Sequence, residues 1–270
     1  MSTSAGHRAR KRFGQNFLHD RNVIDRIVAA IAPGPDDNMV EIGPGLAALT
    51  EPLLARLERL QVVEIDRDLA ARLRSRYSPE RLCVHEADAL RFDFASLGAR
   101  LRVVGNLPYN ISTPILFHLA ACADNLVDMT FMLQKEVVDR IVAPPGTEAY
   151  GRLSVMLQYR FECVKLFSVP PGAFHPVPKV TSAIVRLTPR TELPLAAAAH
   201  ATFGELVRAA FGQRRKTLRN TLRNWLVDAD YQQLGLDSGQ RGETLAVADF
   251  VALTEIVEGR GRGGQAHGQI

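Results

Sequence analysis

The residues best suited to chemistry form one run, Asn106, Leu107, Pro108 and Tyr109. An exocyclic amino group on adenine is a poor nucleophile because its lone pair is delocalised into the ring. The Asn106 side-chain oxygen and the backbone carbonyl of Leu107 or Pro108 could each accept one of its N–H groups and turn the lone pair toward an electrophile. Tyr109 could stack on the same base. A simple turn would explain the asparagine and the proline, but not the aromatic residue after them.

A glycine-containing turn and a later acid indicate a nucleoside cofactor. Gly43 and Gly45 follow a short apolar run, where glycine lets a ligand approach the backbone. Glu64 comes about twenty residues later, the spacing at which an acid accepts hydrogen bonds from ribose hydroxyls. The pair does not distinguish a dinucleotide from S-adenosylmethionine, although the missing third glycine makes a pyrophosphate less attractive.

A third acid, Asp88, follows Glu41 and Glu64 in order along the chain. A single loop aspartate more often caps a turn than binds a ligand. The ends of successive parallel strands line one crevice, however, so we expect the three acids to converge there, with Asp88 able to accept a hydrogen bond from an adenine amino group.

The elements that position these residues are predicted from the apolar pattern. Helical spacing with Asp20 as the N-cap predicts an opening helix. Buried strands are predicted at 39–42, 60–65, 82–85, 101–106 and 129–133, with helical patterns between them at 50–57, 67–77, 112–121 and 136–143. This alternation predicts an α/β fold with a mainly parallel sheet between helices. Two further strands, at 161–169 and 179–187, read as an antiparallel pair that could complete the sheet.

The pattern is helical from about residue 202, with an interruption between Gly235 and Gly242. We place a domain boundary near residue 189, which gives a domain over 1–188 and a helical domain over 189–270. Residues 259–270 lack apolar periodicity and are expected to be disordered.

The net charge of +4 is unevenly distributed. One basic group near the N-terminus and a second one in the helical domain suit a polyanion, although each could equally be solvated. They are Arg8, Arg10, Lys11 and Arg12, and then Arg208, Arg214, Arg215, Lys216, Arg219 and Arg223.

The three cysteines, Cys83, Cys122 and Cys163, stand too far apart for a zinc site or a disulfide framework. No stretch has the apolar length of a membrane span or of a secretion signal. We therefore expect a cytoplasmic protein without a metal and without a membrane partner.

NLPY, preceded by VEIGPG and VEIDRDL and led by RKRFGQNFLHD, resembles the ribosomal RNA adenine dimethyltransferase family, and within it the enzymes of the small subunit (16S). The resemblance continues through FHPVPKVTSA and QRRKTLRNTL. It implies a Rossmann-like class I methyltransferase sheet with a small all-α C-terminal domain, and S-adenosyl-L-methionine as the cofactor. It also implies N6 dimethylation of two adjacent adenosines in a hairpin near the 3′ end of the RNA, within an assembling 30S particle. We expect a monomer.

The resemblance also assigns residues. It implies that segment 11–18 folds over the cofactor and carries Asn16 and Leu18 into the site, where Gly43, Gly45, Glu64, Asp88 and Asn106 complete the cofactor contacts. Phe174 would close over the target base opposite Tyr109, although a core aromatic residue is a comparable interpretation. The helical domain would contribute an RNA-binding groove through Arg214, Arg215, Lys216 and Arg219.

The chain departs from the family at Ala47, where glycine is common. This change matters only if the turn needs a positive φ, and we expect activity to survive it.

Three alternatives remain. A large-subunit enzyme of the resistance type shares the architecture but usually has NIPY in place of NLPY. A non-catalytic RNA-binding assembly factor would not need the intact acids and NLPY. A nicotinamide-dependent oxidoreductase would need the missing third glycine and a proton donor at the hydride site.

Overall fold

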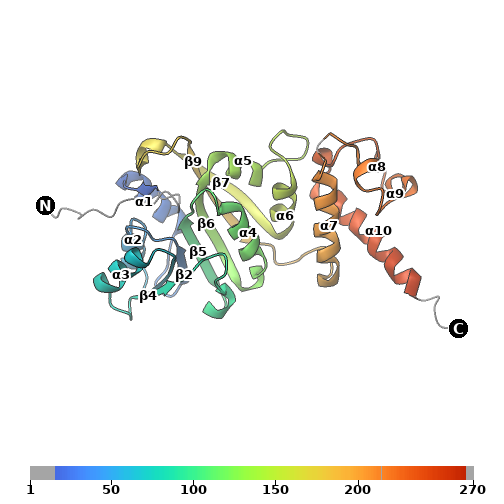
Figure 1. Ribbon diagram of the computed structural model, residues 1–270. Coiled ribbons are helices and arrows are strands. Elements are labelled where there is room, and N and C mark those ends of the chain that lie inside the picture. The colour runs from blue at the N-terminus through green and yellow to red at the C-terminus, as the bar shows by residue number, and fades with distance from the viewer. Residues whose placement is uncertain (1–15, 214, 266–270) are drawn as a thin grey trace. The chain divides into compact units, whose positions relative to one another are not determined.

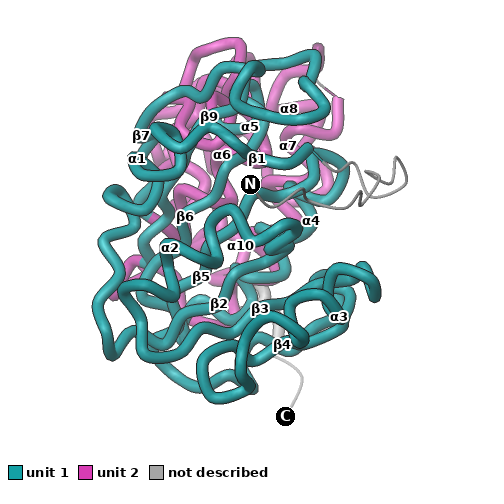
Figure 2. The backbone as a smooth tube through the Cα atoms, turned by 90° about the vertical axis from the view of Figure 1, so that its left-hand side faces the viewer, with its two compact units in different colours: residues 1–138, 162–189 teal, residues 139–161, 190–270 magenta. Residues whose placement is uncertain are grey.

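The computed structural model describes residues 16–213 and 215–265, and the side chains among them up to residue 260. The chain divides into two compact units, residues 1–138 with 162–189, and residues 139–161 with 190–270 (Figure 2). The first unit contains the sheet and the second is helical (Figure 1). The boundary expected near residue 189 therefore omits one segment, since residues 139–161 belong to the helical unit.

The first unit is built on a seven-stranded sheet of order β4-β3-β2-β5-β6-β9-β7 (Figure 1). β4, β3, β2, β5 and β6 pair in parallel, and β9 pairs with β6 in the antiparallel sense. These strands are β2 (Asn38–Ile42), β3 (Leu60–Glu64), β4 (Leu82–Glu86), β5 (Leu101–Asn106), β6 (Leu126–Gln134), β7 (Phe161–Val169) and β9 (Ser182–Pro189). The α/β expectation is confirmed, because each central strand is an apolar run that the sheet buries.

Helices precede or connect these strands. They are α1 (Arg21–Ile31), α2 (Thr50–Leu54), α3 (Arg67–Arg76), α4 (Ser112–Ala120) and α5 (Lys135–Ile141). Asp20 caps α1 as expected, with its Oδ1 accepting from the backbone N–H groups of Asn22 at 2.9 Å and Val23 at 3.2 Å.

Strand order reverses beside β2, which pairs with β3 on one side and with β5 on the other. A crevice for ligands opens at the carboxyl ends of strands at such a point. The two strands approach closely at Gly105, where an added Cβ would lie 2.6 Å from the Ile42 carbonyl oxygen. Only glycine fits there, and the sequence pattern did not single out this position.

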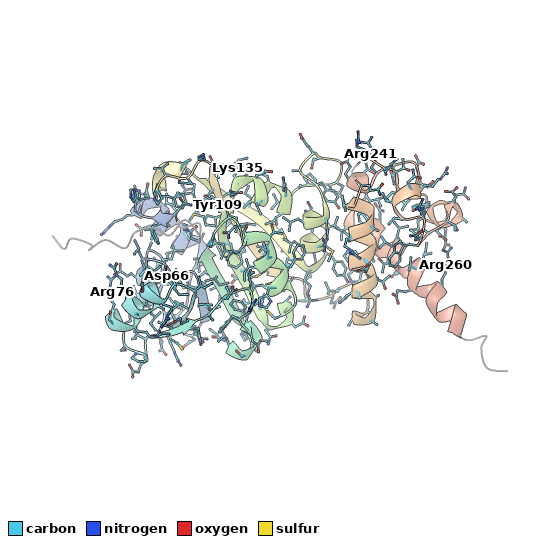
Figure 3. The ribbon with its side chains drawn as sticks, viewed as in Figure 1. Asp66, Arg76, Tyr109, Lys135, Arg241 and Arg260 are labelled. Carbon is cyan, nitrogen blue, oxygen red and sulfur yellow. The ribbon has the colours of Figure 1, made fainter. Side chains whose placement is uncertain are left out.

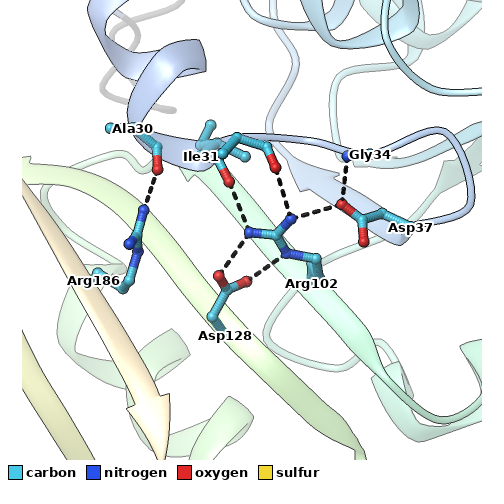
Figure 4. A network of polar contacts seen from close by, with 8 residues as sticks. Ala30, Ile31, Gly34, Asp37, Arg102, Asp128 and Arg186 are labelled. Atoms are coloured by element: carbon cyan, nitrogen blue, oxygen red, sulfur yellow. Dashed lines mark hydrogen bonds and ion pairs between the residues drawn. The ribbon is translucent and has the colours of Figure 1, made fainter.

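The opposite end of β5 holds a buried ionic cluster around Arg102, whose side chain is 13% exposed (Figure 4). Its Nη2 and Nε bind the two Asp128 carboxylate oxygens at 2.7 and 2.9 Å, and its Nη1 lies 2.6 Å from Asp37 Oδ2. Nη2 also donates to the Ile31 carbonyl at 2.7 Å, and Arg186 donates to the carbonyl of Ala30. The cluster ties the C-terminal carbonyls of α1 to the sheet.

A separate ladder of two short strands lies beside the main sheet. β1 (Phe17–Leu18) pairs with β8 (Phe174–His175) in the antiparallel sense, with Leu18 opposite Phe174. This pairing fixes residues 17–18 against a loop more than 150 positions away in the sequence, and two-residue strands carry no periodicity from which it could have been predicted.

The second unit packs five helices, α6 (Arg152–Arg160), α7 (His200–Phe211), α8 (Leu218–Thr221), α9 (Asp228–Gln233) and α10 (Val247–Gln265), within the described residues. Tyr159 of α6 packs against Phe203 of α7 with ring centroids 4.3 Å apart, which explains why α6 belongs here. The expectation that the chain is disordered from residue 259 onward is wrong as far as Gln265, because α10 continues to that residue. A glycine costs a helix about 1 kcal/mol but does not end it. Residues 266–270 lie outside the described residues.

Candidate active site

A cavity of about 260 Å³ opens at the carboxyl ends of the strands beside the reversal of strand order. The predicted site residues that line it come from five segments of the first unit. They are Asn16, Leu18, Gly43, Gly45, Glu64, Asp88, Asn106, Leu107, Pro108 and Tyr109. Glu41, the first acid of the series, lines it as well. The structure thus brings together residues that the sequence spreads over more than ninety positions.

The turn after β2 has backbone conformations that favour glycine. Gly43 has a φ of 66° and Gly45 a φ of 57°. An added Cβ at Gly45 would lie 3.3 Å from the Phe17 ring, so the glycine also lets the N-terminal strand close over the turn. Ala47 has a φ of 71°. The turn therefore does need a positive φ at this position, and alanine in place of the family's glycine is strained there. Alanine in this left-handed conformation costs about 1–2 kcal/mol.

Glu64 ends β3 and is fixed by two backbone donors. Gly45 N–H lies 3.2 Å from its Oε2, and Asp66 N–H lies 2.9 Å from its Oε1. Burial raises the pKa of Glu64, while these two backbone N–H groups oppose the increase. The backbone donors thus orient the carboxylate at the cavity, where its oxygens can also accept from a ligand hydroxyl.

Glu41, at the fourth position of β2, is 2% exposed. Its Oε2 accepts a hydrogen bond of 2.7 Å from the hydroxyl of Thr50, the first residue of α2. Burial raises the pKa of Glu41 to about 7, with the Thr50 hydrogen bond lowering it and the charge of Glu64 adding to the increase. Glu41 thus joins β2 to α2 beneath the cavity.

Asp88 follows β4 and both caps a turn and lines the cavity. Its Oδ1 accepts from Leu90 N–H at 2.9 Å. Asp88 can therefore cap the turn and bind a ligand at the same time, because Oδ1 caps the turn and Oδ2 can accept from a ligand.

Asn106 ends β5 with its amide oriented by the N-terminal segment. Its Nδ2 donates to the Asn16 carbonyl at 3.1 Å. Since a carbonyl can only accept, the NH₂ end of the amide is fixed there and Oδ1 is left to accept. In the next residues, Leu107 N–H donates to the Met132 carbonyl at 3.2 Å, and the Pro108 carbonyl accepts from Ile111 N–H at 3.1 Å. The engaged Pro108 carbonyl favours that of Leu107 as the second acceptor.

Tyr109, labelled in Figure 3, is half-buried and lines the cavity, and both its hydroxyl and its backbone carbonyl have hydrogen-bond partners. Its hydroxyl lies 3.0 Å from Ser182 Oγ, and its carbonyl accepts from Ser112 Oγ at 2.9 Å. Sequence reasoning did not single out either serine, nor the Asn16 carbonyl as the partner of Asn106. Of these partners, only Ser182 lies within a motif quoted for the family resemblance, FHPVPKVTSA, and that position could have drawn attention to it.

Phe174 lies away from the cavity in this structure. Its ring is 1% exposed, packs in the core of the first unit and does not line the cavity. Pairing of β8 with β1 places Phe174 opposite Leu18, where burial of the ring is favourable. In this structure Phe174 is therefore a core residue away from the cavity, as the alternative interpretation has it, and its closure over a base stays a prediction.

The predicted RNA-binding residues lie in the helical unit. Arg215 and Lys216 are exposed. Arg219 is also exposed, but its Nε binds Asp228 Oδ1 at 2.9 Å and Ser238 Oγ at 3.2 Å. Arg214, like the N-terminal basic group and segment 11–15, lies outside the described residues. Asp228, nine positions further along the chain, pairs with Arg219, so this exposed cation already has an acidic partner within the helical unit.

In the described part of the chain, no three His, Cys, Asp or Glu side chains are grouped as they would be to hold a metal ion. Over the same residues, no helix is both long enough and apolar enough to cross a bilayer.

Comparisons with known proteins agree with this geometry. A sequence model of the family described as Ribosomal RNA adenine dimethylase matches residues 6–258. The chain is similar to the Ribosomal RNA small subunit methyltransferase A of Aromatoleum aromaticum, with 67% identity over 251 residues, 93% of this chain and 95% of the relative. The protein of the same name from Nitrosospira multiformis is 60% identical over 248 residues, 92% of this chain and 96% of the relative.

Two solved structures extend the likeness. A dimethyladenosine transferase from Plasmodium falciparum aligns with a TM-score of 0.78 and 26% identity, over 91% of this chain and 98% of its own. The 23S rRNA methyltransferase ErmE aligns with a TM-score of 0.71 and 30% identity, over 90% and 100%. The chain therefore belongs to the ribosomal RNA adenine dimethylase family, and it is a methyltransferase whose cofactor is S-adenosyl-L-methionine.

Proposed function

We propose that this enzyme dimethylates the N6 amino groups of two adjacent adenosines in a hairpin near the 3′ end of small-subunit ribosomal RNA during ribosome assembly. The relatives at 67% and 60% identity carry the small-subunit name, whereas the large-subunit enzyme ErmE is 30% identical. This difference favours the small subunit over the large-subunit alternative. The assembling 30S particle as the partner, action as a monomer, a cytoplasmic location and the lack of a membrane partner are parts of the same proposal.

The residues of the cavity fit the cofactor. The positive-φ turn of Gly43 and Gly45 lets a ligand approach the backbone, and Glu64 offers acceptor lone pairs for ribose hydroxyls. Asp88 is placed to accept from the adenine amino group of the cofactor, and Leu18 supplies apolar contact. When bound, the sulfonium group supplies the methyl group that is transferred.

The observation that carries the catalytic assignment is the orientation of the Asn106 amide. With its NH₂ end fixed by Asn16, the Oδ1 atom and the Leu107 carbonyl each accept one N–H of the target amino group. Their geometry turns the nitrogen lone pair out of conjugation and toward the methyl group. The amine becomes acidic only after methylation, and its proton then passes to water. An assembly factor without catalysis would not need this arrangement.

Binding of the RNA is divided between the two units in this proposal. Tyr109 stacks on the extruded base, a contact worth about 1–3 kcal/mol that tolerates any base. In the helical unit, Arg215 and Lys216 contact phosphates and supply affinity rather than choice of base.

The test is to incubate the purified protein with radiolabelled S-adenosylmethionine and unmethylated small subunits, and then to map the labelled nucleotides. We expect label on two adjacent adenosines near the 3′ end. Asn106→Ala should lower the rate about 100-fold or more, because the amino group loses an acceptor that orients it, while cofactor binding persists. Asn22→Ala, at an exposed position of α1, is the control. Label in large-subunit RNA, or full turnover by Asn106→Ala, would refute the assignment.

A further inference from the structure

The hydroxyl of Tyr109 is attached to a rigid part of the sheet. Its partner Ser182 is the first residue of β9 and is fully buried. Ser182 lies opposite Gln134, the last residue of β6, while Met132 of β6 lies beside Asn106. The serine is therefore anchored at the same end of the sheet as the proposed catalytic amide.

The backbone of Tyr109 is fixed independently of its hydroxyl. Its carbonyl accepts from Ser112, a residue that is 1% exposed and begins α4. The tyrosine side chain has only two rotatable bonds, and its hydroxyl oxygen lies on the axis of the second, so attachment at both ends fixes the first torsion and with it the position and direction of the ring axis. Figure 3 labels Tyr109 and also Lys135, the residue that directly follows β6.

The hydroxyl of Tyr109 differs from other tyrosine hydroxyls of the protein in having a hydrogen-bond partner. Tyr77, Tyr150 and Tyr231 have buried hydroxyls for which the described residues provide no hydrogen-bond partner. The described residues thus provide no protein partner for these three hydroxyls, whereas they provide one for the half-buried tyrosine at the cavity.

We infer that Ser182 is a positioning residue for methyl transfer, whose hydroxyl holds the Tyr109 ring at the position from which it stacks on the target adenine. This inference rests on the proposed function, because it requires Tyr109 to contact the base. A ring released from Ser182 would rotate about its side-chain bonds, and the base would then present its amino group to Asn106 in fewer encounters.

The test compares Tyr109→Phe, Ser182→Ala and the double variant in single-turnover methylation of unmethylated small subunits. Tyr109→Phe keeps the ring and removes only the hydroxyl, so it tests the hydrogen bond from the tyrosine side while the Ser182 side chain stays in place. Each single variant should lower the rate about 5-fold, the effect of one neutral hydrogen bond. The double variant should be no slower than either, because both changes remove the same bond. The affinity for S-adenosylmethionine should change less than about 2-fold.

A second readout follows the base itself. With 2-aminopurine at the target position of a hairpin RNA, stacking on Tyr109 quenches its fluorescence, and both single variants should weaken this quenching to the same extent. Ser154→Ala removes another fully buried serine hydroxyl, in the helical unit, and controls for the loss of stability alone. It should leave the quenching unchanged.

The outcomes separate the two proposals. If Tyr109→Ala methylates at the unaltered rate, the contact of Tyr109 with the base is wrong, and the proposed function fails at that residue. If Tyr109→Ala is slow but Tyr109→Phe is not, the ring acts without its hydroxyl, and the role of Ser182 is refuted. Rate losses that multiply in the double variant would equally refute it.

Discussion

At the scale of single residues, the cavity is built over two buried acids on neighbouring strands. Glu41 and Glu64 both have a raised pKa, with burial as the largest cause. Keeping a carboxylate ionised in such a position costs free energy, which the hydrogen bonds from Thr50 and from the backbone only partly offset. The stability of the first unit should therefore depend on pH.

Glu41→Gln should reveal this dependence. Unfolded, the carboxyl of Glu41 has its ordinary pKa of 4.5, and folded its pKa is about 7. Between these values the folded protein holds a proton that the unfolded chain has released, so the free energy of unfolding falls as pH rises. The integrated loss is at most about 3 kcal/mol. Urea unfolding measures the free energy of unfolding at pH 5 and at pH 8, and that of the variant should rise relative to that of the parent protein between the two. A difference between the two proteins that does not change with pH would contradict this prediction. Glu58→Gln is the exposed control.

Ala47 offers a test of backbone strain. Replacing it with glycine relieves the left-handed conformation but removes a buried methyl group and loosens the unfolded chain. These effects nearly cancel, so Ala47→Gly should change the free energy of unfolding by less than about 1 kcal/mol. Ala70→Gly is the matched control, since Ala70 is buried in the regular helix α3, and it should cost about 2 kcal/mol. Equal losses in the two variants would show that Ala47 is not strained.

At the scale of elements, Arg102 connects β5, β6 and the C-terminus of α1 (Figure 4). A buried guanidinium between two carboxylates has all partners engaged, and removing it leaves Asp37 and Asp128 without their cation. The cluster lies at the other end of β5 from Asn106, about 13 Å away at the rise of a strand.

Arg102→Met should therefore separate stability from catalysis. We expect the free energy of unfolding to fall by about 3 kcal/mol, because the buried carboxylate of Asp128 and the half-buried carboxylate of Asp37 lose their cation. The methyl transfer rate of the folded protein should be unchanged. Urea unfolding and methylation at a low temperature measure the two quantities, with Arg72→Met on the exposed side of α3 as the control. A loss of rate equal to that of Asn106→Ala would show that the cluster acts on the site.

Elements whose signal is local were predicted from the sequence, and elements defined by distant partners were not. The strands from β2 to β6 were predicted within a few residues, because a strand buried on both faces is an apolar run. The assignment of α6 to the helical unit was missed, since it depends on the contact of Tyr159 with Phe203. The site followed the same rule. The strand ends gave the acids and Asn106, but the partners Asn16 and Ser182 come from segments whose proximity no spacing encodes.

At the scale of the whole molecule, the division into two units separates the proposed chemistry from the proposed RNA affinity. The exposed cations Arg215 and Lys216 belong to one unit and the cavity to the other. Each phosphate contact releases counterions, so affinity that comes from these cations should depend on salt concentration.

Arg215→Ala with Lys216→Ala should weaken binding of small-subunit RNA and reduce the slope of log affinity against log salt by about 2. Arg219→Ala should alter the slope less, because Asp228 already neutralises that cation. Filter binding over a range of salt concentrations measures both. An unchanged slope in the double variant would show that these cations do not contact phosphate.

β2 pairs with β3, the strand that directly follows it, and also with the more distant β5, and this second pairing has a consequence for the synthesis of the enzyme. The turn of Gly43 and Gly45 and the acid Glu64 leave the ribosome first. The other side of the crevice, at the end of β5, is not yet synthesised at that stage. It is completed only when β5 has emerged and β6 has joined it to hold Leu107. Non-local pairings of this kind form late in folding. The crevice of a nascent chain is therefore incomplete until β6, which ends at Gln134, has been synthesised and has paired with β5.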